Sequence, residues 1–83
     1  MTDVARTPHQ LGNIIRRARR KRELSQSQLG DLAGLRQETI SLIEMGHPAA
    51  KLETLLSILA VLDLEFRVAP RGKDSELDLE DIF

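Results

Sequence analysis

Residues 25–46, with the sequence SQSQLGDLAGLRQETISLIEMG, contain the signals for two short helices separated by a tight turn. Ser25 can cap the first helix, and Gln28 follows at the spacing of a capping box. Gly34 tolerates a left-handed turn conformation, so we expect the first helix to end there. A second helix is expected over about 37–45. Two helices joined in this way predict a helix-turn-helix unit.

The spacing of small and apolar residues supports this unit. Its two helices cross closely, which requires a small residue midway along the first helix, and Gly30 occupies that position. Gly46 ends the second helix, and Pro48 follows in a loop. Apolar side chains must fill the angle between the helices, and those with suitable spacing are Leu29, Ala33, Leu35, Ile40 and Ile43.

Two further helices are predicted on either side of the unit. Thr7 can cap the earlier helix, with Pro8 at its first position and Gln10 completing a capping box. The later helix, over about 51–62, is apolar around much of its circumference, so we expect it to lie centrally or at an interface. The expected apolar faces are Leu11, Ile14, Ile15 and Ala18 in the first helix, Leu29, Leu32 and Ala33 in the second, and Leu52, Leu55, Leu56, Ile58, Leu59 and Leu62 in the fourth.

After Leu62 the apolar residues alternate with polar ones, which predicts a strand over about 64–69. Leu64, Phe66 and Val68 form its apolar side. A lone strand leaves backbone groups unpaired, so we expect it to pair antiparallel with the same strand of a second copy, giving a homodimer. The alternative is a strand-like segment that lies on the helices without a partner.

The last residues, 71–83, alternate acidic with apolar side chains. One interpretation is a disordered, solubilising tail. The other is a tail that docks its apolar residues on a partner with a basic groove. The predicted organisation is therefore a domain over 7–69 and an acidic tail over 70–83.

Charge is distributed unevenly along the 83 residues, although the net charge is only −1. Residues 1–36 carry eight basic and three acidic side chains, a net charge of +5, whereas 37–69 and 70–83 each carry −3. The basic run 16–22 is either a solvated helix face or a nucleic-acid contact surface. On a helical wheel, Arg16 and Arg20 point away from the apolar face.

Composition excludes several other classes of protein. The chain has no cysteine, so disulfides and thiolate chemistry are absent, and only 2% of its residues are aromatic, unlike single-strand binders that stack bases. No nucleophile–base pair, metal-ligand cluster or phosphate loop is evident, so we expect neither an enzyme nor a cofactor or metal. No apolar run approaches a membrane span or signal peptide, which favours a cytoplasmic protein.

The residues from Leu24 to Gly46 resemble the lambda-repressor-like (Cro/repressor, XRE) DNA-binding domains. The resemblance covers about 11–62, and the later strand and short chain resemble HipB-type antitoxins in particular. It implies a mainly α fold, a four-helix lambda-repressor-like helix-turn-helix domain, with one C-terminal β-strand pairing across a dimer. It also implies double-stranded DNA as a partner, with an inverted-repeat operator.

The resemblance implies that the third helix lies in the DNA major groove. With Ile40 and Ile43 inward, the helical wheel places four residues outward, namely Glu38, Ser41, Leu42 and Met45, and Gln37 beside them. Gln37 can pair with adenine, Glu38 can accept from cytosine, Ser41 can bond several base edges, and Leu42 can contact a thymine methyl. The alternative is that these side chains merely face solvent.

Residues around the third helix also take roles from the resemblance. The glutamine at this position in similar proteins implies that Gln26 contacts a phosphate and braces Gln37. Arg36 departs from the family, which has a Ser or Thr cap there, so it is free to contact DNA instead. Further expected phosphate contacts are Arg16, Arg17 and Arg20. The family also implies a structural ion pair between Arg19 and Glu44, in preference to DNA contact by Arg19.

The leading hypothesis is therefore a transcriptional repressor that also acts as the antitoxin of a HipA-like kinase. One alternative is a stand-alone phage-type repressor. The other is a protein-interaction module on a helix-turn-helix scaffold, which the acidic Glu38 would favour because glutamate repels phosphate.

Overall fold

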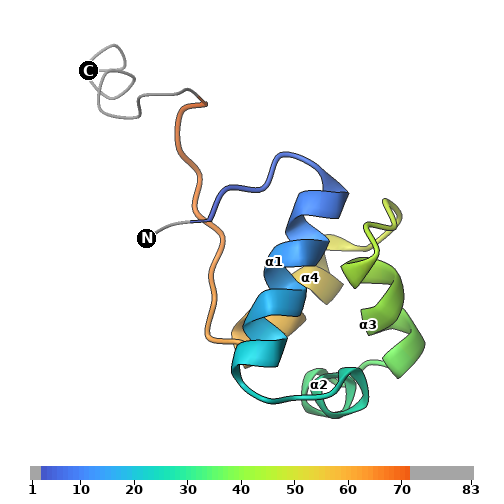
Figure 1. Ribbon diagram of the computed structural model, residues 1–83. Coiled ribbons are helices and arrows are strands. Elements are labelled where there is room, and N and C mark those ends of the chain that lie inside the picture. The colour runs from blue at the N-terminus through green and yellow to red at the C-terminus, as the bar shows by residue number, and fades with distance from the viewer. Residues whose placement is uncertain (1–2, 72–83) are drawn as a thin grey trace.

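The computed structural model describes residues 3–71, in which four helices form one small bundle (Figure 1). The helices are α1 (Pro8–Lys21), α2 (Gln26–Ala33), α3 (Gln37–Glu44) and α4 (Leu52–Val61). Helix α2 packs against both α3 and α4, and α1 packs against α3. The predicted four-helix domain is confirmed, with helix ends within a residue or two of those expected.

Caps at the helix starts account for two of these boundaries. The Ser25 hydroxyl accepts from the Gln28 backbone N–H at 3.0 Å, and the Gln28 side chain accepts from the Ser25 N–H at 2.8 Å, so this capping box is complete. Thr7 likewise accepts from the Gln10 N–H at 3.1 Å. The Gln10 side chain, however, accepts from the N–H of Arg6 and not from that of Thr7, so the second predicted capping box is only half formed.

The tight turn between α2 and α3 depends on two glycines. Gly34 has φ +71°, a left-handed conformation that costs a residue with a Cβ extra free energy. Gly30 faces the turn so closely that a Cβ on it would lie 2.6 Å from the carbonyl oxygen of Leu35. Gly30 was predicted to permit a close helix crossing, and the structure shows it in close approach to the turn that leads into α3.

The core lies between the four helices. Its fully buried side chains are Ile15, Leu29, Ile40 and Ile58, one from each helix, and Ile43, Leu59 and Leu62 extend it. The wheel-based prediction was wrong for Leu32, which is 62% exposed. Leu52 and Leu56 of the largely apolar α4 are 63% and 47% exposed in the single chain. Helix α2 meets α3 and α4 through the side that carries Leu29, and this contact leaves Leu32 uncovered.

Beyond α4 the chain continues as an extended segment that leaves the bundle (Figure 1). No strand is formed within residues 3–71, and Leu64, Phe66 and Val68 are all exposed. The pairing of this segment between two copies stays a prediction, as does the domain boundary at residue 70. The two interpretations of the acidic tail fall almost entirely on 72–83, outside the described residues. In the described range no helix is both long and apolar enough to cross a membrane.

Candidate nucleic-acid interface

Helix α3 turns one side to the core and presents the other as an exposed surface. Ile40 and Ile43 are buried, whereas Gln37 and Glu38 at its start are exposed. Leu42, one turn further on, is 46% exposed. The four residues predicted to contact bases therefore lie on the outer side of one short helix, with Ser41 partly buried among them.

The start of α3 has no side-chain cap, as the arginine at position 36 implied. Its first turn instead relies on the Arg36 carbonyl, which accepts from the N–H groups of Thr39 and Ile40 at 3.0 and 3.3 Å. Glu38 lies in this first turn, where a negative charge interacts favourably with the helix dipole. The Arg36 side chain is exposed, at the residue that directly precedes α3.

An ion pair between Arg19 and Glu44 joins α1 to the end of α3. Nε of Arg19 donates to Oε2 of Glu44 at 2.6 Å, and Nη2 donates to Oε1 at 3.0 Å. Nη1 of Arg19 donates to the carbonyl of Leu24 at 2.8 Å. Both residues are buried, with 8% and 5% of their surface exposed. The hydrogen bonds to Glu44 raise the pKa of Arg19 against the lowering effect of burial, and the charge of Glu44 raises it further.

Close backbone packing places this pair. A Cβ on Gly12 of α1 would lie 2.6 Å from the Glu44 carbonyl oxygen, and it would clash with the carbonyl of Ile43. Because Gly12 lacks a Cβ, α1 can approach the end of α3 closely enough for Arg19 to reach Glu44. This role of Gly12 was not predicted from the sequence.

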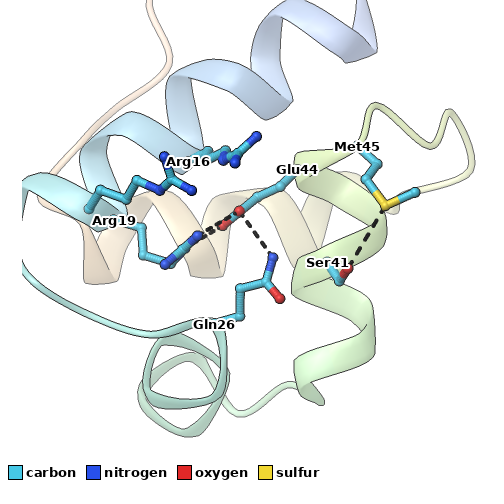
Figure 2. A pocket seen from close by; sticks show the side chains of 7 residues that line it. Arg16, Arg19, Gln26, Ser41, Glu44 and Met45 are labelled. Carbon is cyan, nitrogen blue, oxygen red and sulfur yellow. Dashed lines mark hydrogen bonds and ion pairs between the residues drawn. The ribbon is translucent and has the colours of Figure 1, made fainter.

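Two glutamines continue the hydrogen-bond chain toward the outer side of α3. Gln26 Nε2, at the start of α2, donates to Oε1 of Glu44 at 3.2 Å (Figure 2). Gln37 Nε2, the first residue of α3, then donates to Oε1 of Gln26 at 2.8 Å. The side chain of Gln37 is thus fixed through Gln26 to the buried ion pair, which gives the brace expected of Gln26 a definite geometry.

Arginines from α1 line an open cleft next to α3. Its lining residues come from α1 (Arg16, Arg19 and Arg20), from α2 (Gln26) and from the end of α3 (Ser41, Glu44 and, at the C-cap, Met45). Figure 2 shows the Arg19–Glu44 pair between Arg16 and Gln26. Arg16 and Arg20 also border a second, shallow depression with Arg17 and Asn13, so the basic surface continues along α1. Arg17 forms an ion pair with Asp3 of the N-terminal segment, with 3.6 Å between its Nη2 and Oδ1 of Asp3.

Met45 was placed outward on the helical wheel but given no role. It is 70% exposed, and its sulfur accepts a weak hydrogen bond from the Ser41 hydroxyl at 3.9 Å. Its position four residues after Ser41 was the available signal, since residues at this spacing share a helix face.

The sequence matches the helix-turn-helix family over residues 15–68. The chain belongs to this family, of the Cro/repressor (XRE) type. Helix-turn-helix domains of this type bind DNA, so the exposed side of α3 lies on a DNA-binding domain. No curated protein is similar enough in sequence to count as a relative.

Solved structures give the same fold over most of this helix-turn-helix chain. A chain of a HipB–O2 20mer complex superposes with a TM-score of 0.80 at 26% identity, over 87% of this chain and 100% of that one. A chain of the HipA–HipB–O2–O3 complex has a TM-score of 0.78 at 28% identity, over 86% and 100%. A chain described as MDT protein also superposes with a TM-score of 0.78 at 28% identity, over 86% of this chain and 100% of that one. The domain is thus structurally like the HipB antitoxin.

Proposed function

We propose that the protein is a homodimeric, sequence-specific transcriptional repressor that also binds and neutralises a HipA-like kinase. One observation carries the DNA-binding part of this proposal. The exposed polar side of α3 and the cleft of Arg16 and Arg20 adjoin, so base-contacting and phosphate-contacting groups lie on one surface. A major groove flanked by phosphates has this arrangement of partners.

Helix α3 would insert its exposed side into the major groove. Gln37 can form a bidentate pair with adenine, and Glu38 can accept a hydrogen bond from the cytosine amino group. Ser41 can bond several base edges, and Leu42 can pack against a thymine methyl. A good bidentate pair, such as that of Gln37 with adenine, discriminates between bases by about 1–3 kcal/mol.

The surrounding side chains would hold the DNA backbone without selecting its sequence. Arg16 and Arg20 line the cleft between α1 and α3, and Gln26 lies at the start of α2, where helix N–H groups favour a phosphate. Arg17 extends the basic surface along α1, and Arg36 extends it beside α3. Contacts of this kind predict binding that weakens steeply as salt increases.

Two copies would bind an inverted repeat. The extended segment with Leu64, Phe66 and Val68 would pair with its equivalent across a two-fold axis, which would satisfy its backbone groups and set these three exposed side chains beside those of the second copy. The two α3 helices would then contact half-sites about 34 Å apart. The likeness to a chain of the HipA–HipB–O2–O3 complex supports the kinase as a second partner.

The experiment is a DNA-binding titration with the protein's own promoter region over a salt series. We expect preference for an inverted repeat, weaker binding at higher salt, and loss of the preference in Gln37→Ala. Gln10→Ala, which removes an exposed glutamine at the start of α1, is the matched control and should bind as the wild type does. Equal affinity for promoter and random DNA would refute base recognition by α3.

The kinase half of the proposal is tested separately with a purified HipA-like kinase from the same genomic neighbourhood. We expect a stable complex by size-exclusion chromatography and loss of kinase activity on adding the protein. DNA binding without any effect on the kinase would favour a stand-alone repressor. Kinase binding without salt-sensitive DNA binding would favour a pure interaction module.

A further inference from the structure

The buried ion pair and the base-contacting side of α3 are connected by a hydrogen-bond chain with a defined direction. The chain starts at Glu44, passes through the amide of Gln26 and ends at the amide of Gln37. We propose that Glu44 is a positioning residue for base selectivity, because it fixes the donor and acceptor orientation of Gln37 and thereby makes that residue select adenine over guanine. This inference rests on the proposed DNA-binding function.

The direction of the chain follows from the chemistry of its first member. An ionised carboxylate only accepts hydrogen bonds. Glu44 receives two bonds from Arg19, and its Oε1 also receives Nε2 of Gln26 at 3.2 Å. The Gln26 amide must therefore turn its nitrogen to Glu44, since the opposite orientation would place two acceptor oxygens against each other in a partly buried site.

The second step passes this orientation to the surface. With its nitrogen on Glu44, Gln26 presents its oxygen to α3, and an oxygen only accepts. Gln37 must meet it with a nitrogen, and its Nε2 does so at 2.8 Å. A primary amide has two N–H hydrogens, so Gln37 keeps one N–H donor and its Oε1 acceptor for a partner outside the protein.

One donor beside one acceptor matches adenine. The major-groove edge of adenine offers N7 as acceptor and the N6 amino group as donor, whereas guanine offers two acceptors, N7 and O6. If the Gln26 amide were reversed, Gln37 would accept from it and turn its two N–H donors outward, which would match guanine. The core carboxylate of Glu44 thus selects between two base preferences of the same exposed glutamine.

Two substitutions test the hydrogen-bond chain from Glu44 to Gln37 at different points. Glu44→Gln replaces an obligate acceptor with an amide that can donate or accept, so the orientation of Gln26 is no longer fixed. Gln26→Lys keeps the Arg19–Glu44 pair and supplies a donor-only group, which must donate to Gln37 Oε1 and so turn the Gln37 nitrogen toward the base. Ser27→Lys is the matched control, because it adds the same charge at the neighbouring exposed position of α2.

The Gln37→Ala variant first identifies the operator position whose base preference depends on Gln37. The measurement is then the ratio of the affinities for operators with adenine and with guanine at that position, at one fixed salt concentration. We expect the wild type to favour adenine by about 5-fold to about 150-fold, the span of a good bidentate contact. The ratio should fall toward one in Glu44→Gln and reverse in favour of guanine in Gln26→Lys. Ser27→Lys should tighten binding to both operators and leave the ratio unchanged.

The outcomes separate this inference from the proposed function. Preferences at base pairs contacted by Ser41 and Leu42 should persist in both variants, which excludes general misfolding as the cause, and circular dichroism checks the fold directly. A wild-type ratio in folded Glu44→Gln and Gln26→Lys overturns this inference alone, as does a wild type that favours guanine there. A wild type that discriminates at no position overturns the proposed base recognition and this inference with it.

Discussion

Removing Arg19 should destabilise the protein more than removing any other arginine in the described part of the chain. Its side chain is 10% exposed, that of Glu44 is 3% exposed, and two hydrogen bonds join them. In Arg19→Met, the buried carboxylate keeps only the amide of Gln26 as a side-chain donor. Breaking a buried pair in this way costs about 3–5 kcal/mol, mostly because one charge stays buried without compensation.

The effect is large compared with the stability of so small a domain. The free energy of unfolding of globular domains is roughly 5–15 kcal/mol. A change of about 1 kcal/mol in this free energy shifts Tm by about 4–8 °C in a domain of about 60–100 residues. We therefore expect Arg19→Met to lower Tm by more than about 10 °C in thermal unfolding followed by the circular dichroism signal of the helices. Urea unfolding measures the corresponding loss in the free energy of unfolding. The double variant Arg19→Met with Glu44→Leu should recover most of the loss, because no buried charge remains.

The matched control is Arg17→Met, on the same helix. Arg17 pairs with Asp3 at 3.6 Å with 68% of its side chain exposed, so its loss should cost less than about 1 kcal/mol. An equal loss of stability in Arg17→Met and Arg19→Met would refute the reasoning, as would a double variant no more stable than Arg19→Met.

The contribution of Arg19 should not vary with pH near neutrality. A base whose pKa is raised by folding stabilises the folded state below its unfolded pKa, and this contribution is lost as pH rises through the folded pKa. The pKa of Arg19 is raised from a value already far above neutral. The difference in unfolding free energy between wild type and the double variant Arg19→Met with Glu44→Leu, which leaves no ionisable group at this site, should therefore stay constant from about pH 6 to about pH 9.

Four further substitutions have defined outcomes. Gly30→Ala should lower the free energy of unfolding in urea by about 1–3 kcal/mol, because its Cβ would lie 2.6 Å from the carbonyl oxygen of Leu35. Unchanged stability would contradict the close approach of α2 to the turn. Ile15→Ala should cost about 2–5 kcal/mol, since Ile15 is fully buried, and a surface-like loss below about 0.5 kcal/mol would contradict its place in the core. Arg16→Gln and Arg20→Gln should each reduce the slope of log affinity against log salt by about one without changing base preference, and an unchanged slope would place the arginine away from DNA.

The helices could be predicted from local signals because each depends on few residues close in sequence. The Ser25–Gln28 capping box and the left-handed Gly34 are short-range features, and both form as expected. Helical wheels failed where burial depends on distant elements. Leu32 has the spacing of a core residue, but no described element covers it, and the wheel contains no information about which side of α2 meets α4.

The candidate site divides in the same way. Outward positions on α3 follow from the inward Ile40 and Ile43, so Gln37 and Glu38 could be placed by periodicity. The contact between Arg19 and Glu44, 25 residues apart, could be expected only through the family resemblance. The bond of Gln26 to Glu44 was not anticipated at all, since a sequence does not state which atom of an amide faces a neighbour.

Stability and base selectivity therefore have different requirements at the Arg19–Glu44 pair. An apolar pair at these positions would keep the fold, because well-packed hydrophobic residues often replace a buried ion pair without loss. It would not keep the orientation of Gln26, because an apolar side chain accepts no hydrogen bond and leaves that amide free to turn. The double variant Arg19→Met with Glu44→Leu should thus unfold much like the wild type and yet lose its preference for adenine over guanine. Such a result would mean that the buried charges are needed for the choice of base more than for the fold.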